Sequence, residues 1–160
     1  MRRLRLAALG AAAALAACGF HLQGVTRLPQ AFATTQVVAE DRYTDFHRAL
    51  GDALRASGSR IAGSGATATI EVLTDDSGQR VLSVSASNTP TEYEVYYTIR
   101  YRVRIGDKEV LSPKVLTLTR DYSFDVTAVL AKEQEQDQIR AALARELAAL
   151  VMRRLSALGP

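Results

Sequence analysis

The clearest pattern in the sequence is an alternation of apolar and polar side chains between residues 94 and 105. Apolar positions are Val95, Tyr97, Ile99, Tyr101, Val103 and Ile105, and polar or exposed positions are Glu94, Tyr96, Thr98, Arg100, Arg102 and Arg104. A period of two predicts a β-strand with one buried face. Residues 106–108 then predict a turn, and residues 110–122 predict a returning strand in a long antiparallel hairpin. Pro113 indicates an edge position or a bulge in that strand.

Shorter strands are predicted upstream of this hairpin. Residues 36–40 and 68–74 are rich in apolar and β-branched side chains. The sequence Asp-Asp-Ser-Gly at 75–78 is typical of a turn, because Asp and Ser bond to nearby backbone and Gly accepts a positive φ. We therefore expect a return strand at 81–85, followed by a polar loop at 87–91.

Two helices are predicted from apolar positions at helical spacing. The first follows a cap at Asp41 or Thr44 and ends near Gly58, and its apolar face carries Tyr43, Phe46, Leu50, Ala53, Leu54 and Ser57. The second covers residues 132–158, with a stripe of Ile139, Leu143, Leu147, Leu150 and Leu155. The fold class is therefore α+β: helices on one face of a mostly antiparallel sheet, in a two-layer sandwich.

The first 17 residues are predicted to be a lipoprotein signal peptide. Arg2, Arg3 and Arg5 precede an apolar, alanine-rich segment that is too short to span a bilayer. The segment ends in Leu-Ala-Ala followed by Cys18, the only cysteine of the chain. We expect cleavage before Cys18 and attachment of lipid to its thiol, with multiple acyl chains giving stable anchoring. An ordinary signal peptide with a chance cysteine is the alternative.

Residues 18–160 then form a single predicted domain, of which residues 18–34 are an extended leader from the lipid anchor. Three of the 20 basic residues lie in the signal peptide, so the remaining 17 equal the 17 acidic residues. A neutral mature chain offers no general basic field and argues against nucleic acid as a partner. No later apolar run is long enough for a transmembrane helix.

The sequence carries no recognisable catalytic or metal-binding motif. His21 and His47 are the only histidines and have no cluster of further ligands around them. The carboxylates of Asp75 and Asp76 lie in the predicted turn, where turn formation explains them. We therefore expect a protein that is not an enzyme and uses no cofactor other than the covalent lipid on Cys18.

Basic residues provide the candidate binding positions. Alternation places Arg100, Arg102 and Arg104 in a row on one strand face, about 7 Å apart. Such a row either is a solvated face that opposes aggregation or binds an anionic partner, since guanidinium groups bind phosphate in a bidentate manner. Lys132 is expected to be exposed just before the last helix, where it is either an ordinary surface group or a ligand contact.

Several short motifs together resemble the LptE family of lipopolysaccharide-assembly lipoproteins, also called rare lipoprotein B. They are Cys-Gly-Phe-His-Leu at 18–22, Leu-Pro at 28–29, Thr-Glu-Tyr at 91–93, Arg-Asp-Tyr at 120–122 and Leu-Ala-Lys-Glu at 130–133, continuing through Glu135 into the last helix. The resemblance spans nearly all of the mature chain. Order and spacing make it specific, because only the motif beside the cysteine is distinctive alone.

The resemblance implies two helices packed against a four-stranded sheet and a non-enzymatic role at the periplasmic face of the outer membrane. There the family plugs the β-barrel translocon LptD in a 1:1 complex, helps it assemble, and binds lipopolysaccharide on its way to the outer leaflet. Gly19 after the cysteine is similar to lipoproteins sorted to the outer membrane. Lys132 matches a basic position that the family uses for lipopolysaccharide, and Arg100, Arg102 and Arg104 are further candidate contacts.

One departure from the family concerns the loop before Glu92. A basic residue is common there in the family, whereas residues 85–88 are the neutral Ser-Ala-Ser-Asn. We expect Arg80, in the neighbouring predicted turn, to substitute for it. The alternative function is a binding lipoprotein of another envelope lipid-transport complex, which would have the same anchor and a similar fold but a different protein partner.

Overall fold

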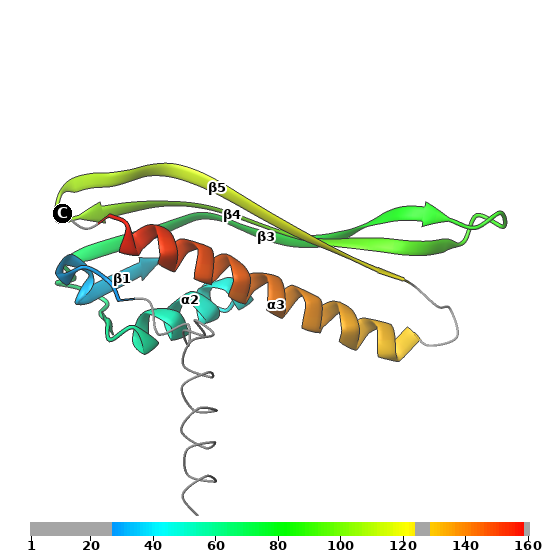
Figure 1. The fold of residues 1–160 in the computed structure, drawn as a ribbon, viewed down its shortest axis with the longest axis horizontal. Coiled ribbons are helices and arrows are strands. Elements are labelled where there is room, and N and C mark those ends of the chain that lie inside the picture. The colour runs from blue at the N-terminus through cyan, green and yellow to red at the C-terminus, as the bar shows by residue number, and fades with distance from the viewer. Residues whose placement is uncertain (1–26, 124–128, 159–160) are drawn as a thin grey trace, which may run out of the picture.

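The computed structural model describes residues 27–123 and 129–158, which form a sheet covered by helices on one face (Figure 1). In chain order the elements are the 3-10 helix η1 (Gln30–Phe32), β1 (Thr34–Val38), α2 (Asp45–Ala56), β2 (Arg60–Ile61), β3 (Ala68–Val84), β4 (Pro90–Ile105), β5 (Lys108–Ser123) and α3 (Val129–Ser156). The predicted α+β class with two layers is confirmed. Cys18 and the predicted signal peptide lie outside the described residues.

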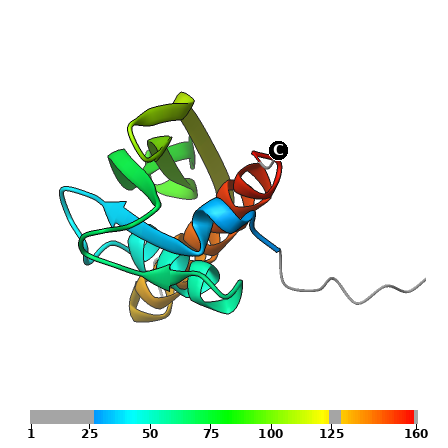
Figure 2. The same cartoon turned by 90° about the vertical axis from the view of Figure 1, so that its left-hand side faces the viewer.

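The sheet has five strands in the order β2-β1-β3-β4-β5, one more than the four that the family resemblance implied. The extra strand is β2, which has two residues and pairs in parallel with β1. Strand β1 also runs parallel to β3, whereas the β3–β4 and β4–β5 pairs are antiparallel. Parallel neighbours need a crossover, and α2 lies in the connection between β1 and β3. The end-on view in Figure 2 shows the resulting separation of sheet and helices.

The turn predicted at residues 75–78 is wrong, because β3 continues through it as one strand of 17 residues. A bulge between Val72 and Thr74 changes the register but does not end the strand. Asp75 does not cap a turn: its two carboxylate oxygens accept hydrogen bonds from the Thr44 hydroxyl (2.6 Å) and the Tyr97 phenol (2.8 Å). Tertiary partners therefore override the local preference of these residues for a turn.

Gly78, the last residue of the predicted turn, has a different use in the strand. It pairs with Tyr96 on β4, and a Cβ atom at this glycine would lie only 2.6 Å from the Tyr96 phenol oxygen. Because glycine has no Cβ atom, the Tyr96 ring can lie directly against the backbone of Gly78.

Residues 81–84 are a strand as predicted, but they continue β3 and do not return, because the chain reverses further on, between Ser85 and Thr89. Backbone hydrogen bonds from Ser85 N–H to Thr89 O (2.8 Å) and from Asn88 N–H to Ser85 O (2.9 Å) close this turn. Asn88 has a φ of 60°, a conformation that asparagine tolerates better than most side chains. Residues 76–96 form what we call the distal hairpin, whose tip projects beyond the end of β5 and the start of α3 (Figure 1).

Helix α2 begins as predicted at Thr44, whose hydroxyl accepts a hydrogen bond from the His47 N–H (3.1 Å). Its end is also confirmed, because Gly58 follows the helix with a φ of 86°. Most of the predicted apolar face is correct: Phe46, Leu50 and Leu54 are fully buried. The position predicted for Tyr43 is wrong, since it precedes the helix and is 89% exposed.

Helix α3 begins at Val129, three residues before its predicted start, and ends at Ser156. The predicted stripe is confirmed at Leu143, Leu147 and Leu155, which are buried between α2 and the sheet. Four further residues beside this stripe are buried too: Ala144, Ala148, Val151 and Met152. The buried face is wide because α3 packs on two neighbours at once. Within residues 27–123 and 129–158, no helix is long and apolar enough to cross a membrane.

Candidate functional site

Lys132 lies within the first turns of α3, so its predicted exposed position before the helix is wrong. Its side chain is only 19% exposed, and its ammonium group is 2.7 Å from a carboxylate oxygen of Glu135. The ammonium also lies over the Tyr122 ring, 5.8 Å from the ring centroid, within the range of a cation–π interaction. The prediction failed because the acidic residues from Glu133 onward suit a helix N-terminus, yet the helix extends one turn further upstream.

Tyr122 connects this lysine to the distal hairpin. Its ring stacks on Tyr93, with ring centroids 5.7 Å apart and an interplanar angle of 17°. Its phenol donates a hydrogen bond of 2.8 Å to the side-chain oxygen of Gln79. Burial raises the pKa of Tyr122 above its ordinary value, Tyr93 and Glu135 act in the same direction, and Lys132 opposes them. Residues from β3, β4, β5 and α3 therefore meet in what we call the tyrosine cluster: Gln79, Tyr93, Tyr122, Lys132 and Glu135.

Arg80 lies next to this cluster in the chain but on the opposite face of the sheet. It pairs in register with Glu94, and its guanidinium is 2.5 Å from a carboxylate oxygen of that residue. Its side chain remains 65% exposed, so the pair leaves the guanidinium accessible.

Apolar side chains surround the tip just beyond Arg80. Val81, Leu82 and Val84 are between 46% and 53% exposed, although each is a large aliphatic residue. Sequence reasoning missed them as a surface because it assigned them to a strand within the sheet. The sequence did carry a signal, because three apolar residues in four positions break the period-two alternation. In the structure, the register shifts at this point.

The arginine row occupies the face of the sheet that the helices leave open. Arg102 donates two hydrogen bonds to Glu71, at 2.8 and 2.5 Å, and Arg104 is 4.0 Å from Asp107. Arg100 is exposed and, among the described residues, makes no ion pair. Glu71 therefore neutralises Arg102, whereas Arg104 has only a long ion pair with an exposed carboxylate and Arg100 keeps its charge available.

The predicted site residues thus form two groups. Lys132 and Arg80 lie at the distal hairpin on opposite faces of the sheet, whereas Arg100, Arg102 and Arg104 follow β4 toward its turn into β5. No group of three or more metal-ligating side chains occurs among residues 27–123 and 129–158. Chemically, the distal end offers cations and exposed aliphatic surface, which suits an amphiphilic anion.

The chain matches known proteins over most of its length. The family model LptE, described as lipopolysaccharide-assembly, matches residues 32–155. The LPS-assembly lipoprotein LptE of Pectobacterium atrosepticum is 29% identical over 157 residues, covering 96% of this chain and 85% of that protein. The protein with the same name in Yersinia enterocolitica is 24% identical, and the match covers 96% of this chain and 75% of that protein.

Solved structures show the same fold. Rare lipoprotein B from Shewanella oneidensis superposes with a TM-score of 0.68 at 22% identity, covering 78% of this chain and 94% of that one. Lipoprotein B from Nitrosomonas europaea gives a TM-score of 0.72 at 23% identity, covering 87% and 91%. The family model covers well over half of the chain, and the chain therefore belongs to the LptE family of lipopolysaccharide-assembly lipoproteins.

Proposed function

We propose that this envelope lipoprotein is anchored through Cys18 on the periplasmic face of the outer membrane. There it plugs and helps assemble an LptD-type β-barrel and binds lipopolysaccharide during delivery to the outer leaflet. Members of the LptE family are not enzymes and need no cofactor, so binding is the whole of the activity that has to be explained. A lipid tether would raise the effective concentration of the domain beside a membrane barrel.

The composition of the distal end of the molecule is the main support for lipopolysaccharide binding. Lipopolysaccharide presents phosphate groups on an acylated sugar, so its receptor needs cations beside apolar surface. The tip supplies the apolar surface of Val81, Leu82 and Val84. Arg80 precedes Val81 in the chain, and Lys132 is connected to the hairpin through the ring and phenol of Tyr122. Aliphatic side chains exposed at the end of a projecting hairpin are costly in water unless a partner covers them.

The tyrosine cluster explains how Lys132 would act. Glu135 and the Tyr122 ring hold its ammonium group in place near the N-terminal end of α3. A phosphate that approaches Lys132 competes with Glu135 for the ammonium, so binding would exchange one ion pair for another. Tyr122 also donates a hydrogen bond to Gln79 on β3, so such an exchange would alter the contacts at the base of the distal hairpin.

The open face of the sheet is the surface that we assign to the barrel. It is uncovered by helices and carries Arg100 beside Val115, which is 59% exposed and pairs with it across β4 and β5. The face also carries the ion pair of Arg102 with Glu71 and a hydrogen bond of 2.9 Å between the hydroxyls of Thr98 and Thr117. Such a mixed polar surface suits contact with the polar interior of a large barrel better than it suits contact with lipid.

Gentle detergent extraction of the tagged full chain, followed by mass spectrometry, tests the proposal. We expect one large β-barrel at near equal stoichiometry, together with lipopolysaccharide. Recovery of an inner-membrane transporter, or of no barrel, would contradict the proposal; the transporter would favour the alternative of another lipid-transport complex.

Charge reversal separates the two binding activities. Lys132→Glu should reduce the lipopolysaccharide recovered with the chain by about tenfold or more, because an attraction becomes a repulsion, while the barrel is still recovered. Arg60→Glu is the matched control, since Arg60 is an exposed basic residue on β2, far from the distal hairpin in the sheet order. Equal lipopolysaccharide recovery with both variants would remove Lys132 from the site.

A further inference from the structure

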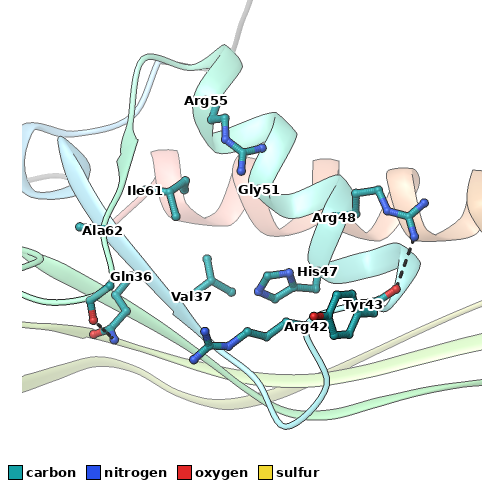
Figure 3. A pocket seen from close by; sticks show the side chains of 11 residues that line it. Gln36, Val37, Arg42, Tyr43, His47, Arg48, Gly51, Arg55, Ile61 and Ala62 are labelled. Atoms are coloured by element: carbon teal, nitrogen blue, oxygen red, sulfur yellow. Dashed lines mark hydrogen bonds between the residues drawn. The ribbon is translucent and has the colours of Figure 1, made fainter.

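A second basic site lies away from the distal hairpin, where α2 crosses β1 (Figure 3). It is an open cavity of about 570 Å³, of the size that small-molecule sites usually have. Its lining contains three arginines, one histidine and no carboxylate: Gln36, Val37, Arg42, Tyr43, His47, Arg48, Gly51, Arg55, Ile61, Ala62 and Gly63. We call it the basic cavity.

Three cationic or titratable side chains converge on the basic cavity. Figure 3 shows the Arg42 guanidinium beneath the His47 imidazole, and Arg55 reaching down from α2 on the opposite side. Arg48 is directed away, toward the backbone oxygen of Tyr43 at 3.4 Å. Arg42 makes no ion pair with any residue of the described chain, which leaves its charge uncompensated at the cavity.

The Arg55 guanidinium lies beside Gly51 of α2, and both residues line the cavity. A Cβ atom at this position would lie 3.6 Å from one guanidinium nitrogen of Arg55 and 3.8 Å from the other. These are ordinary contact distances, so the guanidinium packs against the helix at Gly51, while its side chain remains 62% exposed and pairs with Asp52.

Two nearby carboxylates are engaged away from the cavity, and two others form exposed ion pairs with its arginines. Asp75 accepts hydrogen bonds from Thr44 and Tyr97, and Asp41 accepts one from the backbone N–H of Tyr43 at 2.7 Å. The partners of Arg48 and Arg55 on α2 are Asp45 (3.6 Å) and Asp52 (2.8 Å). Those two arginines are 66% and 62% exposed, and ion pairs so exposed are weak, so an incoming anion can displace them.

His47 reports the electrostatic balance of the cavity. Burial lowers its pKa below the ordinary value, Arg42 lowers it further, and Asp75 and Asp41 oppose this without overcoming it. Arg55 adds a smaller effect in the lowering direction. Burial is thus the main cause of the lowered pKa and the positive charge of Arg42 is the second, and an anionic ligand beside the imidazole would oppose both.

We infer that the basic cavity binds a phosphate group carried on a neutral moiety, with Arg42, Arg55 and His47 as its donors. Guanidinium groups match phosphate oxygens in a bidentate manner, and Val37 and Ile61 form an apolar wall for the neutral part. The inference is independent of the lipopolysaccharide proposal, because it uses none of the residues of the distal hairpin or the tyrosine cluster.

Nuclear magnetic resonance of the full chain in a neutral detergent tests this inference through the His47 imidazole. The probes are inorganic phosphate, short-chain phosphatidylglycerol and, as the zwitterionic control, short-chain phosphatidylcholine. We expect phosphate or phosphatidylglycerol to raise the pKa of His47, since an adjacent anion favours the imidazolium. A shift with both identifies phosphate itself as the ligand, whereas a shift with phosphatidylglycerol alone identifies a lipid headgroup.

Two variants decide whether the effect is specific. Arg42→Gln should weaken binding by about tenfold or more, whereas Arg60→Gln, which alters an exposed arginine outside the cavity, should leave it within about twofold. Equal losses in the two variants would mean general charge attraction, and the absence of any His47 shift would mean no site. Either result would overturn the inference.

Discussion

The two ends of the central β-hairpin are made of the same strands yet have opposite character. Near the helices, Ile70, Tyr101 and Val103 are fully buried. Toward the tip of the distal hairpin, Val81, Leu82 and Val84 are about half exposed. The backbone pairing is continuous between these regions, apart from bulges, so the difference comes from the layer of helices, which ends before the strands do. Stability is therefore concentrated at one end, and free apolar surface at the other.

A buried hydrogen-bond network marks the border between the two regions. The Tyr97 phenol donates to Asp75 at 2.8 Å and accepts from the backbone N–H of Phe46 at 3.1 Å. Asp75 in turn accepts from Thr44, the N-cap of α2. This network fixes the start of α2 to the middle of the hairpin, so the distal part is held in place without a core of its own.

The largest expected effect is at the covered end. Leu147→Ala should lower the free energy of unfolding by about 2–5 kcal/mol, because Leu147 is fully buried between α3, α2 and the sheet and its truncation leaves a cavity. Chemical denaturation followed by circular dichroism measures this. A loss below about 1 kcal/mol would show that the covered end does not dominate stability.

Removal of the Tyr97 hydroxyl should have the next largest effect. Tyr97→Phe leaves the Phe46 N–H and one Asp75 oxygen without this partner, at a cost of about 1–3 kcal/mol in unfolding free energy.

The same residue makes stability depend on alkaline pH. Burial and then the hydrogen bond to Asp75 raise the pKa of Tyr97 well above its ordinary value, so the folded state retains a proton that the unfolded state loses near pH 10. Unfolding free energy should therefore fall as pH rises above about 10 in the wild type, and fall less steeply in Tyr97→Phe. Identical alkaline slopes in the two proteins would contradict this assignment.

A smaller effect is expected at Gly78, on the open face of the distal hairpin. Gly78→Ala places a methyl group against the Tyr96 phenol and should cost about 1 kcal/mol, because the ring has to move. In a Tyr96→Ala background the same substitution should cost nothing further. A double-mutant cycle from denaturation curves gives this coupling, and additive losses would exclude the contact as the reason for the glycine.

The smallest effect on stability is expected at the tip. Leu82→Ser should change unfolding free energy by less than about 0.5 kcal/mol, because Leu82 is exposed and lies outside the buried core. It should nevertheless reduce the lipopolysaccharide recovered with the chain, if the tip serves the proposed binding. A large loss of stability with unchanged recovery would reverse the assigned roles of the two ends.

Sequence reasoning found the fold class, the β4–β5 hairpin and both helices, because these depend on regular periodicity. It failed at Asp75 and Gly78, whose local preference for a turn is overridden by Tyr97, Thr44 and Tyr96 from other elements. It also singled out Lys132 but not the ring of Tyr122 beneath it, because contact between β5 and α3 is not encoded in either segment alone.

The sequence by itself determined the alternation along β4, the cap at Thr44, the end of α2 near Gly58 and the apolar stripe of α3, since each depends on neighbours within a few residues. Only the tertiary structure decided where the helical cover stops, and hence that Val81, Leu82 and Val84 are exposed while apolar residues of the same strand are buried. It alone also brought Arg42, His47 and Arg55 around one cavity. Burial and charge balance are properties of packed layers, and a single segment cannot specify what will lie against it.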